Sequence, residues 1–223
     1  MIYVTADTHG EIDRFKEKDI RRLGRKDTLI VLGDFGFLWD GSKQEQKNLH
    51  WLTKRRYKIL FLDGCHDNYD MLKEYPEEPF MGGRARHIGG SVYYICRGSV
   101  LEIEEKKLLC FGGGESFDKE DRVEGVNWWR AEMPTSDELE WCIDNLKACE
   151  NQVDYILTHD APRKLLDFTN IRSEDFQGNW LHAFFDKLID RVQYRCWYFG
   201  RYHRDQAIST KARAVFCNVI PLE

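Results

Sequence analysis

Short apolar runs that alternate with helix-length segments constrain the fold of this chain most strongly. Ile2–Thr5, Thr28–Leu32 and Lys58–Leu62 predict buried strands, because each run is apolar and stops near a turn residue or a glycine. The segments between them, Glu11–Leu23 and Lys43–Arg55, predict helices. Strands that alternate with helices favour crossover connections, so we expect an α/β fold with a mainly parallel sheet.

The middle of the chain predicts a different arrangement. Ser91–Cys96, Val100–Glu104 and Lys107–Phe111 are short runs separated by only a few residues, which predicts an antiparallel meander. The segment Gly112–Pro134 follows without a clear period. A loop of this length inside a compact domain is usually functional or disordered, and its two adjacent tryptophans favour order.

The last third predicts two helices and further strands. Thr135 and Glu138 have the spacing of a capping box, and an apolar helical stripe follows them. That stripe consists of Leu139, Cys142, Ile143, Leu146 and Cys149. A second stripe consists of Phe176, Trp180, Phe184, Phe185, Leu188 and Val192. Strands are expected at Val153–Leu157, Cys196–Phe199 and Ala214–Ile220. With no linker or repeat between these elements, we expect one domain over residues 1–223.

Composition is that of a folded soluble protein. Of 223 residues, 42% are hydrophobic and 32% are charged, which excludes disordered, collagen-like and coiled-coil classes. A net charge of −5 does not indicate nucleic acid or an anionic membrane as a partner. No apolar run approaches the roughly 18 residues of a membrane helix. Asp7 and His9 also interrupt the N-terminal segment where a secretory signal needs an apolar core, so we expect a cytoplasmic location.

Potential metal ligands follow the predicted strands at the point where each strand ends. The motifs are Asp7-Thr8-His9, Gly33-Asp34, Gly64-Cys65-His66-Asp67, Thr158-His159-Asp160 and Gly200-Arg201-Tyr202-His203. Open α/β sheets place their binding crevices at the carboxyl ends of strands. Mixed carboxylate and imidazole ligands suit divalent metals such as Mn, Fe or Zn. One such histidine alone would favour a structural role, but five strand-end coincidences favour a metal site.

In chain order these motifs resemble those of the calcineurin-like metallophosphoesterases, whose pattern runs D-x-H, G-D, G-N-H-D/E, a lone His and G-H-x-H. The resemblance spans Asp7 to His203. The segment Gly112–Pro134 also resembles that of small bacterial members, with Gly113-Gly114, Ser116-Phe117-Asp118-Lys119 and Trp128-Trp129. The resemblance implies two mixed β-sheets packed face to face with helices outside. It also implies metal-dependent hydrolysis of a phosphate monoester or diester.

The resemblance further implies two metals bridged by one carboxylate. The first metal would be held by Asp7, His9, Asp34 and His203, which are all present. The second would be held by Asp34, by His159 and by the two positions that carry Cys65 and Arg201 in this chain. An arginine cannot ligate a cation, because its guanidinium stays protonated and offers no lone pair. We therefore expect one divalent metal and a second site that is doubtful.

Four interpretations of Cys65 and Arg201 are open. In the first, Arg201 stands in electrostatically for the second metal and binds the phosphate of the substrate in a fork. In the second, the site binds one metal without catalysis. In the third, Cys65 ligates a metal such as Zn as a thiolate and the site is dinuclear. In the fourth, these two residues are not the natural ones.

His66 and Asp67 complete the site that the resemblance implies. A metal-bound hydroxide would attack the phosphorus, and His66 would protonate the departing alkoxide. Asp67 would raise the pKa of His66 and fix its tautomer. The alternative is that His66 only hydrogen-bonds its own loop. Asp160 follows His159 and is a candidate for orienting it.

The function expected from the sequence is therefore hydrolysis of a phosphorylated substrate, with phosphoprotein, nucleotide and diester substrates all open. In the long loop, Asp118, Lys119 and Arg122 either reach that substrate or form a solvated charge cluster. The alternative function is an inactive scaffold that uses the fold to bind a metal or a protein. The intact first ligand set favours the enzyme, whereas Cys65 and Arg201 favour the scaffold. The sequence carries no signal for the oligomeric state.

Overall fold

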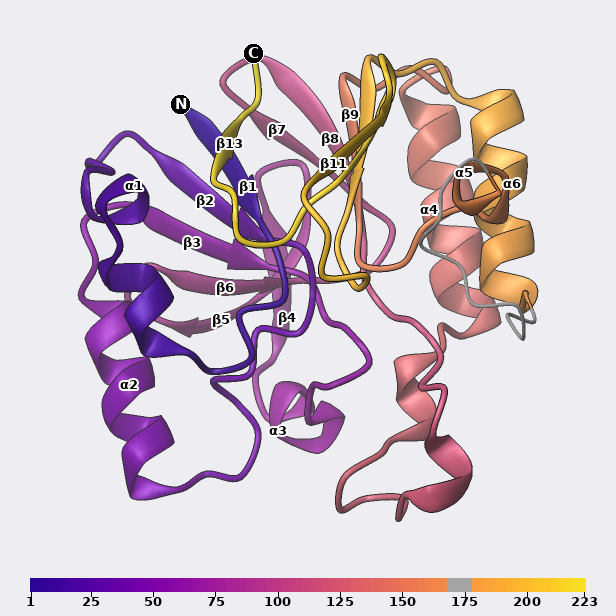
Figure 1. The fold of residues 1–223 in the computed structure, drawn as a ribbon. Coiled ribbons are helices and arrows are strands. Elements are labelled where there is room, and N and C mark those ends of the chain that lie inside the picture. Colours follow the sequence, from indigo (N-terminus) through magenta and orange to yellow (C-terminus); the bar gives the residue numbers. More distant parts are fainter. Residues whose placement is uncertain (168–177) are drawn as a thin grey trace.

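Two mixed β-sheets pack face to face and carry helices on their outer faces (Figure 1). The computed structural model describes residues 1–167 and 178–223. The first sheet, in spatial order, contains β13 (Ile220–Pro221), β1 (Ile2–Thr5), β2 (Thr28–Val31), β3 (Lys58–Phe61), β6 (Val92–Ile95), β5 (Gly83–Gly89) and β4 (Glu77–Phe80). The second contains β11 (Gln206–Ser209), β12 (Ala212–Ala214), β10 (Cys196–Phe199), β9 (Tyr155–Thr158), β8 (Lys106–Phe111) and β7 (Ser99–Ile103).

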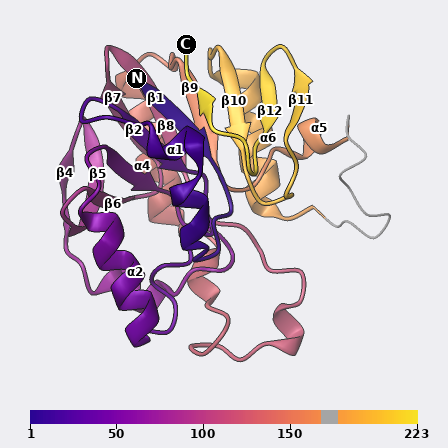
Figure 2. The same cartoon turned by 60° about the vertical axis from the view of Figure 1, so that its left-hand side comes forward.

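Helices lie outside this pair of sheets. They are α1 (Lys18–Arg21), α2 (Lys43–Thr53), α3 (Tyr69–Lys73), α4 (Ser136–Ala148), α5 (Arg163–Leu166) and α6 (Trp180–Arg191). Short 3₁₀ helices cover Ile12–Lys16, Lys119–Asp121 and Arg130–Glu132. Figures 1 and 2 show α1 and α2 beside the first sheet and α4 and α6 beside the second. No helix in the described part of the chain is long and apolar enough to cross a membrane.

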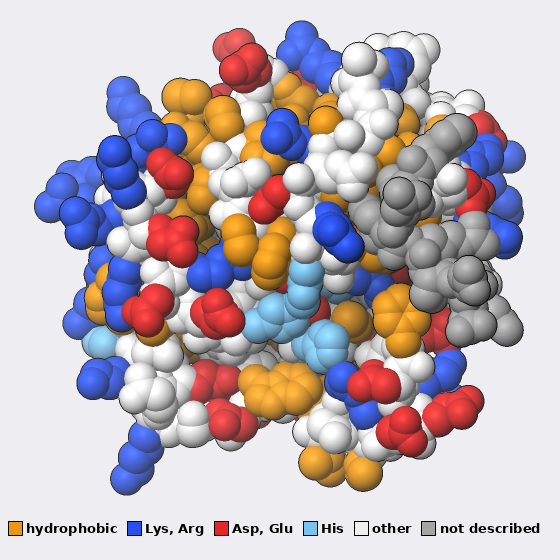
Figure 3. Space-filling view, in the orientation of Figure 1, with side chains coloured by type: hydrophobic (Ala, Val, Ile, Leu, Met, Phe, Trp, Pro, Cys, Tyr) orange, Lys and Arg blue, Asp and Glu red, His pale blue; other side chains and the backbone are white. Residues whose placement is uncertain are grey.

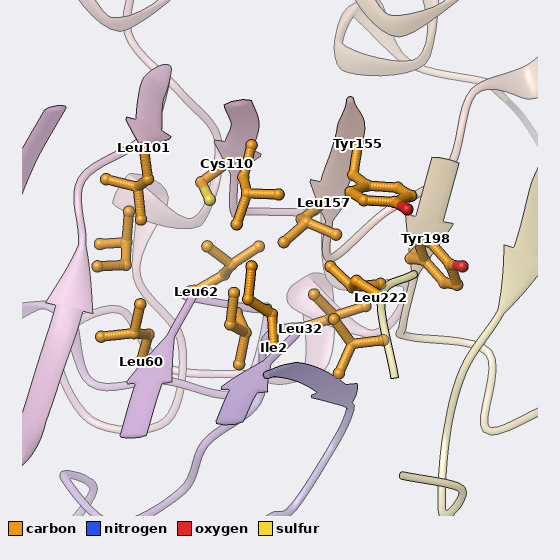
Figure 4. Packing of buried hydrophobic residues seen from close by; sticks show 14 of the residues in the cluster. Ile2, Leu32, Leu60, Leu62, Leu101, Cys110, Tyr155, Leu157, Tyr198 and Leu222 are labelled. Atoms are coloured by element: carbon orange, nitrogen blue, oxygen red, sulfur yellow. The ribbon is translucent and has the colours of Figure 1, made fainter. Parts of the chain in front are cut away.

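The core between the sheets is built from alternate residues of the central strands. In and after β2, Ile30 and Leu32 point into this core, whereas Leu29 and Val31 point outward against the helices. Leu60 and Leu62 from the β3 side meet Leu101, Leu108 and Leu157 from the second sheet (Figure 4). Central strands that are buried on both faces account for the unbroken apolar runs in the sequence.

The outer faces have cores of their own. Phe15, Ile20 and Leu52 pack with the outward residues of the first sheet. Leu146 of α4 and Phe185 of α6 pack with the outward residues of the second sheet. Thr135 and Glu138 form the expected capping box at the start of α4, and Asn179 with His182 forms a second one that begins α6.

Three expectations about secondary structure are wrong. The predicted helix Glu11–Leu23 is a 3₁₀ turn followed by the short α1, because the backbone of Glu17 is extended between them. The predicted strand Ala214–Ile220 is the end of β12, a connecting segment and the start of β13. In that connection the backbone amides of Phe216, Cys217 and Asn218 donate to the carboxylate of Asp205 instead of to a strand.

The predicted three-stranded meander is also divided between the two sheets. β6 pairs in parallel with β3, whereas β7 and β8 pair with each other in the second sheet. The preceding β4 and β5 were not expected, because they lie at the edge of the first sheet and expose charged side chains that obscure their pattern. Phe176, which was assigned to the second helical stripe, lies outside the described residues.

Candidate metal centre

Five strands from the two sheets bring their carboxyl ends to one crevice. β1, β2 and β3 run parallel in the first sheet, and β9 and β10 run parallel in the second. The side chain of His159, after β9, packs directly over the Cα of Gly33, after β2, where any Cβ would collide with its imidazole. Gly64, after β3, leaves room in the same way for the carboxylate of Asp34. The glycines therefore let groups from both sheets approach within ligand distance.

The backbone at this crevice is strained. Five of the predicted site residues have positive φ angles: Asp7 (49°), His9 (44°), Asp34 (48°), Arg201 (67°) and His203 (49°). Residues other than glycine rarely adopt this left-handed conformation, and it persists where the surrounding structure imposes it. Such strain concentrates at functional sites, so its presence at five positions around one crevice supports a functional role.

Ligand atoms of Asp7, His9 and His203 lie within 4.8 Å of one another. The Nε2 atoms of His9 and His203 are 3.0 Å apart. Asp34 adjoins this group, with its Oδ2 atom 3.7 Å from His9 Nε2. The structure thus brings together all four residues that were predicted to hold the first metal.

A second group consists of Asp34, Cys65 and His159, whose ligand atoms also lie within 4.8 Å of one another. The Sγ atom of Cys65 lies 3.7 Å from His159 Nε2 and 3.9 Å from Asp34 Oδ2. His159 Nε2 is 3.6 Å from Asp34 Oδ1, and its other ring nitrogen faces the carbonyl oxygen of Leu32 at 3.0 Å. Asp34 therefore lies between the two groups, with one carboxylate oxygen near His9 and the other near His159.

The protonation of these groups suits a cation. Burial lowers the pKa of His159, His9 and His203, so their imidazoles are neutral and have a lone pair to offer. Burial and the neighbouring Asp34 raise the pKa of Asp7 well above its usual range. Burial opposes ionisation of Asp34, but His159 and His66 outweigh it and lower the pKa of Asp34. Two adjacent buried carboxylates repel each other unless one is protonated or a cation lies between them, so a bound cation would be stabilised here.

A test of fit is whether the residues leave a polar atom without a partner. Oδ1 of Asp7 accepts a hydrogen bond from the backbone amide of Arg201 at 3.0 Å. Oδ2 of Asp7 is buried and has no hydrogen-bond partner among the described residues. Buried carboxylate oxygens almost always have partners, so this atom is a candidate metal ligand. With neutral imidazoles around it, the donor set fits a divalent ion such as Mn, Fe or Zn.

Arg201 is buried beside the second group rather than in it. One guanidinium nitrogen, Nη1, lies 3.2 Å from Asp160 Oδ2, and Nη2 donates to the carbonyl oxygen of Glu115. The guanidinium also lies over the ring of Phe117. Its positive charge lowers the pKa of both Cys65 and His159, although burial raises the pKa of Cys65 overall. A fixed cation therefore lies next to the incomplete half of the centre.

The family assignment rests on a match over most of the chain. A family model described as calcineurin-like phosphoesterase matches residues 1–204. The chain belongs to the calcineurin-like phosphoesterase family. No curated protein gives a significant match to this family member.

Two solved structures resemble this calcineurin-like phosphoesterase. A putative 5'-nucleotidase from Staphylococcus aureus, in complex with alpha-ketoglutarate, matches with a TM-score of 0.50 and 13% identity. That match covers 96% of this chain and 48% of the other, so this chain spans about half the length of that protein. Phosphopantetheinyl hydrolase from Mycobacterium tuberculosis matches with a TM-score of 0.40 and 16% identity, over 96% of this chain and 89% of the other. At such identities the likeness to the first structure supports the fold alone.

The contacts of Asp67 and Asp160 differ from those expected. Nδ1 of His66 lies 3.0 Å from Asp34 Oδ2, so Asp34 orients the ring. Asp67 instead accepts hydrogen bonds from the backbone amides of Gly64 and Gly36 and holds the two loops together. Burial raises the pKa of Asp67 to about 7. The expectation that Asp67 orients His66 is therefore wrong.

Asp160 likewise orients other groups than His159. It pairs with Arg201, accepts a hydrogen bond from the hydroxyl of Tyr202, and lies 3.1 Å from Nε2 of His182. A histidine inside an amphipathic helix gives no sequence signal of a contact 22 residues away, so the contact with Asp160 could not be predicted for His182. Its place in the second capping box, three residues after Asn179, was the one available hint.

The segment 112–134 is ordered and reaches the centre, as its tryptophans indicated. Ser116 donates to Glu132 across the base of the segment, and Trp129 donates to Asp70 at 2.8 Å. Of its three charged candidates, only Arg122 contacts the centre, through His66. Lys119 pairs with Glu115, and Asp118 pairs with Arg122.

A cavity of about 450 Å³ opens beside His9 and His66. Trp39, Asn48 and Glu45 contribute to its wall. In the face seen in Figure 3, histidine side chains gather near the centre and adjoin both hydrophobic and charged groups. Of the candidate metal ligands, His9 thus lines a hollow that is large enough for the organic part of a small ester.

Proposed function

We propose that this calcineurin-like phosphoesterase hydrolyses phosphate esters with one divalent metal. The observation that supports the proposal is the convergence of Asp7, His9, Asp34 and His203 around a buried carboxylate oxygen that lacks a partner among the described residues. A bound divalent ion polarises the phosphoryl group and lowers the pKa of water. These four side chains would hold that ion, with Mn, Fe or Zn all compatible with the ligands.

His66 is proposed as the proton donor to the leaving oxygen. Asp34 holds Nδ1 of its ring, so Nε2 points away from the metal ligands. The same contact raises the pKa of His66, although burial and the charge of Arg122 oppose it, so the ring is able to take up the proton that it donates. The adjoining cavity leaves space for the departing alcohol next to this nitrogen. General acids within hydrogen-bond reach of the leaving group typically contribute 10²–10⁴-fold to such reactions.

Arg201 is proposed to replace the second cation in charge only. Its guanidinium has no lone pair with which to ligate a metal ion. Its positive charge lies close enough to His159 and Cys65 to lower the pKa of both groups. The raised pKa of Cys65 keeps this thiol protonated, which disfavours it as a metal ligand. The loss of Cys65 as a ligand also favours the second candidate function, in which the fold binds one metal without turnover.

Hydrolysis of an aryl phosphate and an aryl phosphodiester, with Mn²⁺ or Zn²⁺ added to protein of measured metal content, tests the proposal. We expect metal-dependent turnover that His9→Asn abolishes. The matched control is His50→Asn, which changes an exposed histidine of α2 far from the ligands in the sequence. Metal-loaded protein that hydrolyses neither substrate would contradict the proposal and favour the scaffold.

A further inference from the structure

Arg122 extends from the segment 112–134 to the proposed proton donor. Its Nη2 atom lies 2.9 Å from Nε2 of His66. Two further contacts fix the guanidinium: Nε lies 2.8 Å from Asp118 Oδ1, and Nη1 donates to the carbonyl oxygen of Asn127 at 3.0 Å. The side chain of Arg122 is only 16% exposed. The charged end is therefore held at the mouth of the metal centre and is not a solvated surface group.

The contact with His66 gives the Nη2 end of this guanidinium an uncharged partner. A guanidinium only donates hydrogen bonds, so Nε2 of His66 must be the acceptor in this arrangement. A neutral imidazole is a weaker partner for a cation than an anionic oxygen. Because Nη2 has this imidazole nitrogen as its partner, a phosphoryl oxygen that arrives beside His66 would be the stronger acceptor and would replace it.

Arg122 differs from Arg201 in how completely its charge is balanced. Asp160, which pairs with Arg201, has no exposed surface and holds that guanidinium in the interior. Asp118, which pairs with Arg122, is 55% exposed, so water screens much of its charge. Nε and Nη1 of Arg201 make no hydrogen bond among the described residues, but they lie in the interior beside Asp160. Arg122 lies at the mouth of the centre with a partner whose charge water screens, so of these two arginines it is the one that an incoming anion can reach.

The segment that bears Arg122 is anchored at its base and exposed at its tip. Ser116 and Glu132 join the two ends of the segment, and Arg97 donates to the carbonyl oxygen of Ala131 at 2.8 Å. Between these anchors, Val123 and Val126 are exposed. The backbone amide of Val123 donates to the side chain of Asn127, and this hydrogen bond holds the turn at the tip together. The base therefore fixes where Arg122 is presented, and the exposed tip allows the side chain to change partners.

We propose that Arg122 binds a phosphoryl oxygen of the substrate next to His66. This proposal assigns anion recognition to the segment 112–134 and not to Arg201. It rests on the proposed function, because that function makes the substrate a phosphate ester. In the free protein Arg122 donates to His66 Nε2. In the complex Arg122 donates to the phosphoryl group, and the freed Nε2 takes up a proton from water, which it then gives to the leaving oxygen.

Calorimetric titration of metal-loaded protein with inorganic phosphate tests the role of Arg122 without requiring turnover. We expect Arg122→Gln to weaken phosphate binding about tenfold or more, since a bond to a charged group is lost. Arg122→Lys should retain part of the affinity, because it keeps the charge but not the fork. The matched control is Arg130→Gln, which removes a mostly exposed arginine of the same segment and should leave phosphate affinity unchanged.

A second variant separates anion binding from loop structure. Asp118→Asn removes the competing carboxylate charge, so phosphate should bind at least as tightly as in the unaltered protein. Weaker binding in Asp118→Asn would mean that the ion pair merely builds the loop and would overturn the proposal, as would unchanged binding in Arg122→Gln. Metal content and hydrolysis are measured in parallel. Loss of phosphate binding in Arg122→Gln, with no hydrolysis by the unaltered protein, supports the anion site while refuting the proposed function.

Discussion

The guanidinium of Arg201 and the carboxylate of Asp160 form an ion pair at 3.2 Å in which both side chains are almost completely buried. Burial alone would lower the pKa of Arg201 and raise that of Asp160, but their mutual attraction outweighs it and shifts both the other way. This pair occupies the side of the centre where the family resemblance implied a second metal. The protein therefore carries a buried internal charge pair beside the group formed by Asp34, Cys65 and His159.

Breaking this pair on one side should destabilise the protein strongly. Arg201→Met leaves Asp160 buried without its cation, and we expect a loss of about 3–5 kcal/mol in the free energy of unfolding. The double variant Arg201→Met/Asp160→Asn removes both charges and should recover most of that loss. Denaturant unfolding of the three proteins measures this difference. Equal stability of the single and double variants would contradict a coupled pair.

Metal content should be closer to one ion per chain than to two. Arg201 brings positive charge to the second half of the centre, and the thiol of Cys65 has a raised pKa. Arg201→His restores a potential ligand and removes the charge, so it should increase the metal content. Elemental analysis after dialysis against Mn²⁺ or Zn²⁺ measures the metal content of the unaltered protein and of the Arg201→His variant. Two ions in the unaltered protein, with Cys65 as a ligand, would establish a dinuclear centre instead.

Asp7→Asn should affect the metal-free and the metal-loaded protein in opposite directions. Without a cation, burial and Asp34 disfavour the ionised form of Asp7, so a neutral amide relieves repulsion. Asparagine also tolerates the positive φ of this position. We expect a higher melting temperature in the presence of a chelator, and a smaller shift on adding metal. A lower melting temperature with the chelator would show that Asp7 stabilises the fold by itself.

The buried carboxyl of Asp67 should make stability depend on pH. Its pKa is about 7 in the folded protein against 3.8 when unperturbed, with burial as the main cause. As the pH rises from about 4 to about 7, the unfolded chain releases this proton first, so the free energy of unfolding should fall. Asp67→Asn should remove this component. Thermal unfolding of both metal-free proteins at several pH values provides the comparison, and parallel pH profiles would rule it out.

The sequence predicted where the candidate ligands converge, because each of these positions depends on a local pattern. Asp7, His9 and Asp34 follow apolar runs that could only be buried strands, and parallel strands bring such ends together. The contacts of Asp67, Asp160 and His182 could not be predicted in this way. Each depends on which loop of a distant strand or helix lies opposite, and the sequence does not give the relative placement of two sheets.

The strands at the edge of the first sheet could not be predicted from the sequence either. β5 carries Arg84, Arg86 and His87 at or near solvent, so its alternation does not resemble an apolar strand. The sequence also did not indicate that β6 and β7 belong to different sheets. Cys96, Arg97 and Gly98 connect them in a span short enough for a hairpin, and only packing determines that the chain crosses between layers there.

The left-handed backbone at Asp7, His9, Asp34, Arg201 and His203 has a consequence for engineering. Glycine at one of the four ligand positions would relax the backbone at the expense of a ligand, whereas at Arg201 it would also leave Asp160 buried without its cation. A campaign that selects variants only for survival at high temperature would therefore be drawn toward dismantling this crevice while leaving the sheets intact. Heat tolerance and metal retention should be scored together in any such library, because improvement in the first alone would reward the loss of the second.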